Sequence, residues 1–332
     1  PERREEPPLQ VVIAPTTNNV ALIAVDGLTF ELARARPDLL GSFPVIAPLP
    51  RMAGASATER WASVGTGVPP SLHRVRAVDG VQLASGAHML QSVSRGDVVL
   101  RDIAPALRIA RRQPLPPTVR RRDYVWEIFA GRGLSSVAVN WWTSDDVRSP
   151  TLDSVSQTPI FSAAAANARP EDAALRVDET ASARAISDSS RLKPRFATVY
   201  LPALDIVQNR IDIDAATRLA ASVRALENMH RTIEKMRSVG SLIVIGLPGD
   251  GQSGHAVLAS QLPLSQMPSS AFDLAPTVCA LLGFPPSEEM PGRPLIGTAQ
   301  RIATYGARNA APAETKVNQE YYETLRSLGY IR

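Results

Sequence analysis

The sequence predicts an α/β fold in which a doubly wound, mostly parallel central sheet carries helices on both faces. Short apolar runs rich in β-branched residues are typical of buried parallel strands, and they recur at 20–25, 45–50, 134–142, 196–201 and 242–245. Segments with helical spacing lie between them, at 30–40, 58–67, 120–131, 214–239 and 272–282. Strands that alternate with helices over the whole length indicate this class of fold.

The predicted strands are followed by turns or polar residues. VALIAV at 20–25 stops at Asp26 and a glycine, and FATVYL at 196–201 is followed by Asp205. LIVI at 242–245 leads into the loop GLPGDGQSGH, after which AVLAS is a further short strand. The stretch 150–195 is rich in Ala, Ser and Asp and is expected to be loop and helix.

The predicted helices carry start and stop signals. Ser56 or Thr58 is the expected N-cap of the helix at 58–67, with Glu59 in its first turn. The helices at 120–131 and 272–282 stop at Gly131 and Gly283.

The chain of 332 residues, 44% of them hydrophobic, is long enough to bury a sizeable core. We expect one domain over 20–298, with an irregular insertion at about 71–120. Residues 1–19, which begin PERREEPP, are expected to be a solvated linker, and 299–332 a tail with a short helix. On that helix Tyr322, Leu325 and either Leu328 or Gly329 share one face, which would dock on this domain or on a partner.

Composition excludes several classes of function. The net charge is +4, but the arginines are scattered and no dense basic stripe carries interleaved aromatics, so no nucleic-acid partner is predicted. Cys279 is the only cysteine, which rules out a disulfide framework within this sequence and a cysteine metal site. No run of 18 apolar residues occurs, so no transmembrane segment is predicted.

Polar residues gather where three predicted strands end. These are Asp26, Asp205, and the loop that contains Asp250 and His255. In an open α/β sheet, ligands bind at the carboxyl ends of the strands, and converging carboxylates and histidines suit a metal-dependent hydrolase. Taken singly, each aspartate is more typical of a turn or a cap.

Five segments in order carry a family resemblance. They are ALIAVDGL, RWASVGTGVPPSLHR, VAVNWWTSDDV, TVYLPALDIVQN and FDLAPTVCALLGFPPSEEMPGRPL. Together they resemble the alkaline phosphatase superfamily over about 20–298, in particular its type I phosphodiesterase/nucleotide pyrophosphatase, sulfatase-like branch. One departure is Arg74, where the family usually has glycine.

The resemblance implies two metal ions, commonly zinc, and a Thr or Ser at a helix start that attacks phosphorus. In register with the family, Asp26, Asp205 and His255 match metal ligands. The nucleophile position is Ala57, which has no oxygen, so only its neighbours Ser56 or Thr58 would be substitutes.

Three further ligand positions are lost in the same register. Asn209 stands where a histidine is expected, and Leu247 and Pro248 stand where an Asp and a His are expected. Asp250 would replace a ligand only after a rearrangement of its loop, which Pro248 stiffens. Neither implied site keeps the three protein ligands that are usual for a catalytic zinc.

The residues therefore predict a pseudoenzyme, a catalytically degenerate domain that serves as a structural or binding subunit of a larger assembly. We expect no cofactor or, if any, one weakly held zinc or manganese ion. Protein partners are expected, including subunits of a membrane complex, with a periplasmic or extracytoplasmic location tethered to a membrane.

Two alternatives remain open. One is an active metal-dependent phosphoester or sulfatase-like hydrolase with a rearranged site that uses Ser56 or Thr58 with Asp205, Asn209, Asp250 and His255. The other is a sensor that binds an anion without turnover.

Overall fold

A computed structural model describes residues 11–52, 55–83, 89–91, 110–165, 168–297, 300–309 and 319–331. An eight-stranded mixed sheet runs through the molecule in the order β2-β11-β10-β1-β9-β6-β8-β7. Its strands are β1 (Val20–Asp26), β2 (Val45–Leu49), β6 (Ser136–Trp141), β7 (Val147–Arg148), β8 (Leu152–Ser156), β9 (Phe196–Leu201), β10 (Ser241–Leu247) and β11 (Ala256–Ser260). The five strands from β10 to β8 pair in parallel, whereas β11 pairs antiparallel with both β10 and the edge strand β2, and the edge strand β7 pairs antiparallel with β8.

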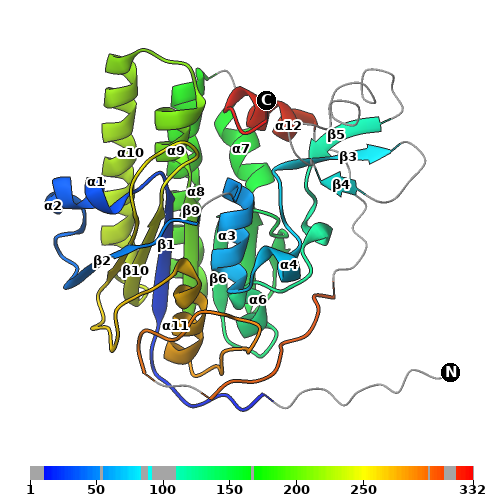
Figure 1. The fold of residues 1–332 in the computed structure, drawn as a ribbon, viewed down its shortest axis with the longest axis vertical. Coiled ribbons are helices and arrows are strands. Elements are labelled where there is room, and N and C mark those ends of the chain that lie inside the picture. The colour runs from blue at the N-terminus through cyan, green and yellow to red at the C-terminus, as the bar shows by residue number, and fades with distance from the viewer. Residues whose placement is uncertain are drawn as a thin grey trace.

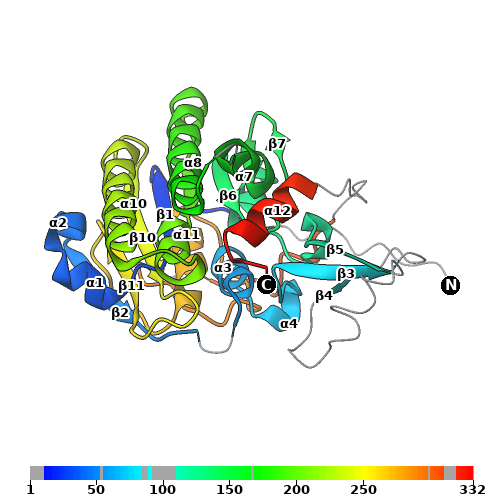
Figure 2. The ribbon, with the colours of Figure 1, turned by 90° about the horizontal axis from the view of Figure 1, so that it is seen from above.

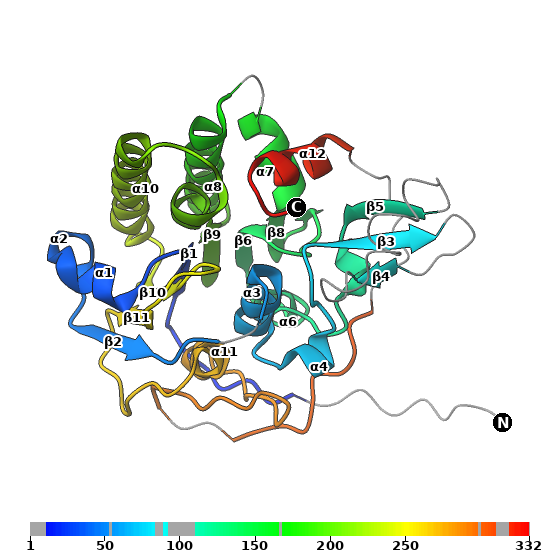
Figure 3. The same cartoon turned by 45° about the horizontal axis from the view of Figure 1, so that its top comes forward.

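Helices cover both faces of this sheet, as predicted for the fold class. On one face lie α7 (Gln157–Ala165), α8 (Pro170–Leu192) and α10 (Ala215–Met236). On the other lie α3 (Ala57–Thr66), α6 (Val125–Ala130) and α11 (Leu274–Leu281) (Figure 3). Burial of apolar surface between these layers supplies the main favourable free energy of folding.

The central strand β1 sets the position of the site. All seven of its residues are buried, which explains why its sequence is a continuous apolar run rather than an alternating one. It pairs in parallel with β10, where Asp26 lies opposite Leu247, and with β9, where Val25 lies opposite Leu201. The carboxyl ends of β9, β1 and β10 therefore meet at one edge of the sheet.

A second, three-stranded antiparallel sheet lies within the predicted insertion. Its order is β4-β3-β5, with β3 (Asp79–Leu83), β4 (Met89–Gln91) and β5 (Ala110–Pro114). It lies beside α4 (Pro70–His73) and at the side of the main sheet (Figure 2).

The structure differs from the sequence prediction in three places. The helix expected at 30–40 is two short helices, α1 (Phe30–Ala35) and α2 (Pro37–Leu40), because Pro37 disfavours helical geometry at the residue before it. The helix expected at 120–131 begins only at Val125. The stretch 150–195 contains β8 as well as helices, and its buried Asp153 hid the strand pattern.

Both flanking segments contact the domain where they are described. The backbone N–H of Ala14 donates to the carbonyl oxygen of Gly283 at 2.8 Å. The tail helix α12 (Gln319–Ser327) packs against α7, and its Tyr321 hydroxyl bonds Gln157 Oε1 at 2.8 Å. Residues 1–10 of the expected linker lie outside the described residues. No helix in the described ranges is long and apolar enough to cross a membrane.

Candidate functional site

Three carboxylates and two arginines meet at the carboxyl ends of the central strands. We call this group the carboxylate–arginine cluster; its members are Asp26, Asp205, Asp250, Arg60 and Arg210. Asp26 and Asp205 are fully buried, whereas the side chain of Asp250 is 49% exposed. A buried carboxylate requires a compensating charge or hydrogen bonds, and the arginines supply the positive charge.

Arg60 enters the cluster from the first turns of α3. Ser56 caps this helix, and its hydroxyl accepts from the backbone N–H of Glu59 at 3.2 Å in a capping box. Arg60 lies three residues after Ala57 and so on the same helix face. Its Nη1 donates to Asp250 Oδ1 at 2.8 Å and to the carbonyl oxygen of Ala55 at 2.9 Å.

Arg210 enters from the segment that follows β9. The short helix α9 (Ala203–Asp205) continues into a π-helical turn, η3 (Ile206–Arg210), which returns Arg210 toward Asp205. Its Nε donates to Asp205 Oδ2 and its Nη2 to Asp250 Oδ2, the latter at 3.2 Å. Asn209 Nδ2 donates to the other oxygen of Asp205 at 2.9 Å. Both oxygens of Asp205 are therefore satisfied by protein donors.

The charges of the cluster are strongly coupled. Burial, followed by the negative charge of Asp205, raises the pKa of Asp26 to about 7, against the opposing effects of the two arginines. Tyr200 donates its hydroxyl to Asp26 Oδ2 at 2.9 Å. For Asp250, burial favours the neutral form, but Arg210 and Arg60 hold its pKa below the usual range. When Asp26 is protonated, the two remaining carboxylates balance the two guanidinium groups.

One edge of the Arg60 guanidinium has no partner. Its Nε and Nη2 are buried and make no hydrogen bond in the described part of the chain, and the same holds for Asp26 Oδ1. The charge of Asp26 is the leading influence that raises the pKa of Arg60 against its burial. Buried polar groups of this kind usually bond to ordered water or to a small ligand.

The C-terminal segment covers part of the cluster. The Arg210 guanidinium lies 4.2 Å from the centre of the Tyr330 ring, and that ring packs edge-on against Trp142 at 5.1 Å. Gly329 has φ of +75°, and a Cβ there would lie 2.5 Å from the carbonyl oxygen of Arg210. This close approach requires glycine.

At the nucleophile position, the side chains have structural partners. Ala57 is buried at the first position of α3. The Ser56 hydroxyl bonds Thr58 Oγ1 at 3.0 Å and the carbonyl oxygen of Arg76 at 3.1 Å. Thr58 is itself buried, and its hydroxyl bonds the Ser56 side chain that caps the helix.

The loop after β10 lies against Asp205. Leu247 and Pro248 are buried, and Leu247 is beside Asp26 as the register of the two strands requires. A Cβ at Gly249 would lie 1.7 Å from Asp205 Oδ1 and 2.7 Å from Asn209 Nδ2. Only glycine lets the backbone come this close.

His255 lies apart from the cluster. Its side chain is exposed, and its Nδ1 lies 2.8 Å from Oε1 of Glu31 in α1. The hydrogen bond from His255 lowers the pKa of Glu31. The structure brings together Asp26, Asp205 and Asp250 but does not add His255 to them.

The donor set at the cluster does not fit a zinc or manganese site. No group of three or more His, Cys, Asp or Glu side chains in the described ranges could hold a metal ion. Arg210 and Asn209 already occupy the oxygens of Asp205, which are the oxygens that a metal would require.

Sequence reasoning missed four residues of the site: Arg60, Arg210, Tyr200 and Tyr330. Two of them had a readable signal. Arg60 lies one helical turn after Ala57, where the resemblance implies a nucleophile, and Arg210 directly follows Asn209, where it implies a histidine. Tyr330 had no local signal, because it reaches the cluster only through the docking of the tail.

No protein-family model matches the sequence, and no curated protein matches it. Solved structures do match. Human ectonucleotide pyrophosphatase/phosphodiesterase 5 aligns at 11% identity with a TM-score of 0.52, over 83% of this chain and 97% of that one. The 2-O GAG sulfatase BT1596 aligns at 12% identity with a TM-score of 0.52, over 84% of this chain and 73% of that one.

A third match is phosphonoacetate hydrolase from Sinorhizobium meliloti, at 12% identity with a TM-score of 0.46. The alignment covers 73% of this chain but 60% of the length of that hydrolase. The two matches above a TM-score of 0.5 confirm the alkaline-phosphatase-like α/β fold that the sequence resemblance predicted.

Proposed function

We propose that this protein is a catalytically inactive domain with a phosphodiesterase- or sulfatase-like fold, and that it serves as a structural or binding subunit of a larger assembly. The fold is shared with phosphoester and sulfate hydrolases, but fold does not determine function. The proposal depends on the chemistry at the ends of the central strands.

The observation that carries the proposal is the pairing of Arg210 with Asp205 and Asp250. A guanidinium neutralises carboxylates, but it is not a Lewis acid and does not generate a hydroxide nucleophile as a metal ion does. The arginines therefore balance the negative charge of the carboxylates. They do not supply the Lewis acid or the activated nucleophile that a two-metal site supplies. Ala57 adds support because it has no oxygen, and the hydroxyls of its neighbours Ser56 and Thr58 bond each other.

The assembly part of the proposal has separate support. The sheet and its helices enclose a large buried apolar core, although position 57 carries no hydroxyl and Arg210 occupies Asp205, which is expected of a domain that serves through its surface rather than as a catalyst. We further propose that the partners are proteins of a membrane-associated complex and that the domain lies on the extracytoplasmic side.

Metal analysis of the purified protein, with hydrolysis assays on an aryl phosphodiester and an aryl sulfate in added zinc or manganese, tests the proposal. We expect no stoichiometric metal and no turnover above buffer. Two bound metals, together with turnover that is lost in Asp205→Ala, would overturn it. The control variant is Arg231→Ala, which removes an exposed side chain of α10. It should behave as the wild type does in both assays.

A further inference from the structure

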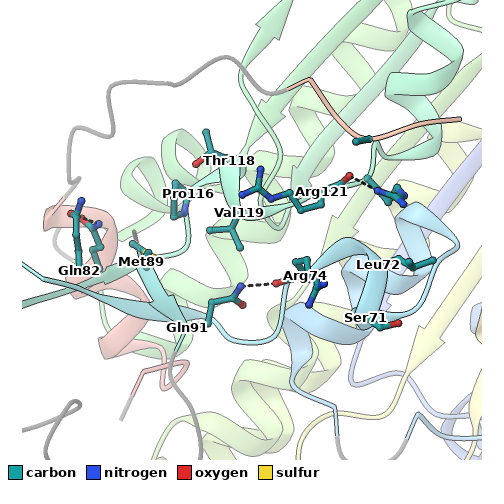
Figure 4. A pocket seen from close by; sticks show the side chains of 13 residues that line it. Ser71, Leu72, Arg74, Gln82, Met89, Gln91, Pro116, Thr118, Val119 and Arg121 are labelled. Atoms are coloured by element: carbon teal, nitrogen blue, oxygen red, sulfur yellow. Dashed lines mark hydrogen bonds between the residues drawn. The ribbon is translucent and has the colours of Figure 1, made fainter. Parts of the chain in front are cut away.

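A pocket of about 650 Å³ lies away from the carboxylate–arginine cluster, between the small sheet and the segment around η2 (Pro117–Val119) (Figure 4). Its volume is within the range of about 300–1,000 Å³ that is usual for ligand pockets. Each strand of the small sheet contributes a glutamine to its wall: Gln82, Gln91 and Gln113. Arg74, Arg121 and Arg122 also line the pocket.

Two of these arginines have no acidic partner among the described residues. Arg122 is bound by both oxygens of Glu289, at 2.7 and 3.0 Å, and so is neutralised. Arg74 and Arg121 are exposed, and no carboxylate in the described ranges pairs with either. The pocket therefore carries two guanidinium groups that are available to an anion.

The glutamine wall is ordered and leaves one acceptor free. Gln91 donates to the carbonyl oxygen of Arg74 at 2.5 Å and accepts from the backbone N–H of Arg76 at 2.7 Å, which holds β4 against the loop after α4. Gln113 Nε2 donates to Gln82 Oε1 at 2.8 Å. Gln113 Oε1 is buried and has no hydrogen-bond partner in the described part of the chain. Because this oxygen is buried, the N–H donor of a ligand would reach it only after the Gln113 side chain turns toward the pocket.

Apolar side chains complete the lining. Leu72, Met89 and Val119 offer surface that would pack on methylene groups. A ligand that combines carboxylates, N–H donors and short aliphatic stems is an acidic peptide. An inorganic anion would use the arginines but leave most of the volume and the Gln113 acceptor unused.

We propose that this pocket binds an acidic, glutamate-rich peptide segment of a partner protein. This inference rests on the proposed function, because the peptide would belong to the protein partner proposed there. It adds the chemical nature of the segment that this partner presents. The pocket is also connected to helix α3 through Arg76. The carbonyl oxygen of Arg76 accepts from the hydroxyl of Ser56, which caps α3, and the backbone N–H of Arg76 donates to Gln91 in the pocket wall.

Calorimetric titration of the full chain with acetylated hexaglutamate, with hexaglutamine as the control peptide, tests the proposal. We expect hexaglutamate to bind and hexaglutamine not to bind, with affinity that falls as salt is raised. The double variant Arg74→Gly/Arg121→Gln should bind about tenfold more weakly, since each lost charge-assisted contact weakens binding. Arg74 has φ of 67°, so glycine at this position keeps the backbone geometry.

The matched control is Arg231→Gln, an exposed arginine on α10, which should bind as the wild type does. The proposal is overturned if the wild type does not bind hexaglutamate, or if the double variant binds it as tightly as the control variant. It is also overturned if inorganic phosphate binds the pocket as tightly as the peptide. Metal content and hydrolysis on the same samples test the proposed function separately, so the two can fail independently.

Discussion

The guanidinium of Arg210 binds the fully buried carboxylate of Asp205 at the carboxyl end of the central sheet. In register with the family that the sequence resembles, Asp205 matches a metal ligand, and Arg210 follows Asn209, where a histidine is expected. A monovalent side chain thus supplies the positive charge that the buried carboxylate needs. The predictions below follow from this relationship and from its neighbours.

Replacing Arg210 should strongly destabilise the protein. Arg210→Met keeps an aliphatic stem but leaves Asp205 buried without its counter-charge, a change that typically costs about 3–5 kcal/mol. Chemical denaturation measures this loss as a fall in the free energy of unfolding. Arg231→Met, on the exposed face of α10, should change it by less than about 0.5 kcal/mol.

The double variant Asp205→Asn/Arg210→Met separates loss of the ion pair from loss of packing. Because it removes both charges, it should recover a large part of the stability lost in Arg210→Met. Equal destabilisation in the single and double variants would mean that the pair is not the reason for the loss.

Stability should fall as pH rises from 3.8 to about 7 because of Asp26. Its pKa is raised from 3.8 to about 7 in the folded protein, so the folded state holds this proton more tightly than the unfolded state. The contribution is complete below pH 3.8 and is lost as pH approaches 7. Between these two pH values, the free energy of unfolding should fall by about 4 kcal/mol because of this one proton.

Asp26→Asn is the control for this pH dependence. The amide cannot titrate but can still accept from the Tyr200 hydroxyl, so the unfolding free energy of the variant should change less between pH 5 and about 8 than that of the wild type. Parallel pH profiles for the two proteins would show that Asp26 titrates normally.

The tail should contribute to stability through Tyr330. Tyr330→Ala removes a buried ring that stacks on Arg210 and packs on Trp142, and should cost about 3 kcal/mol. Tyr330→Phe keeps the ring and both contacts and should cost about 1 kcal/mol or less. Thermal or chemical unfolding measures both, and an equally large loss in Tyr330→Phe would contradict the role given to the ring.

Restoring the family residues alone should not restore a metal site. In the variant Ala57→Thr/Asn209→His/Leu247→Asp/Pro248→His, Arg60 and Arg210 still occupy the carboxylates, so zinc binding by calorimetry should remain weak. Adding Arg60→Ala and Arg210→Ala should allow zinc to bind, because the carboxylates are then without a counter-charge. Tight zinc binding by the first variant would show that the arginines do not compete with the metal.

Much of the fold could be predicted from sequence because its central strands are continuous apolar runs. All seven residues of β1 and all six of β9 are buried, so the pattern is unambiguous. The strand β8 was missed because its inward-facing Asp153 is buried in ion pairs with arginines of α8, and a charged residue in the interior breaks the apolar pattern.

The site could be predicted only in part. The family register predicts that Leu247 stands at a ligand position, and the observed pairing of β1 with β10 places it opposite Asp26. The positions of Arg60 and Arg210 next to Ala57 and Asn209 could be read from the sequence, but the inward direction of their charges could not, because an arginine on a helix usually points its charge into water. The contact of Tyr330 with Arg210 joins residues 120 positions apart, which no local pattern encodes.

The most direct test is a crystal structure of the wild-type protein grown with zinc, with anomalous data collected at the zinc absorption edge. The account predicts the Arg210 guanidinium on Asp205, Arg60 on Asp250, and no anomalous peak at the cluster. A strong peak bound to Asp26 and Asp205, with Arg210 turned away from them, would contradict it.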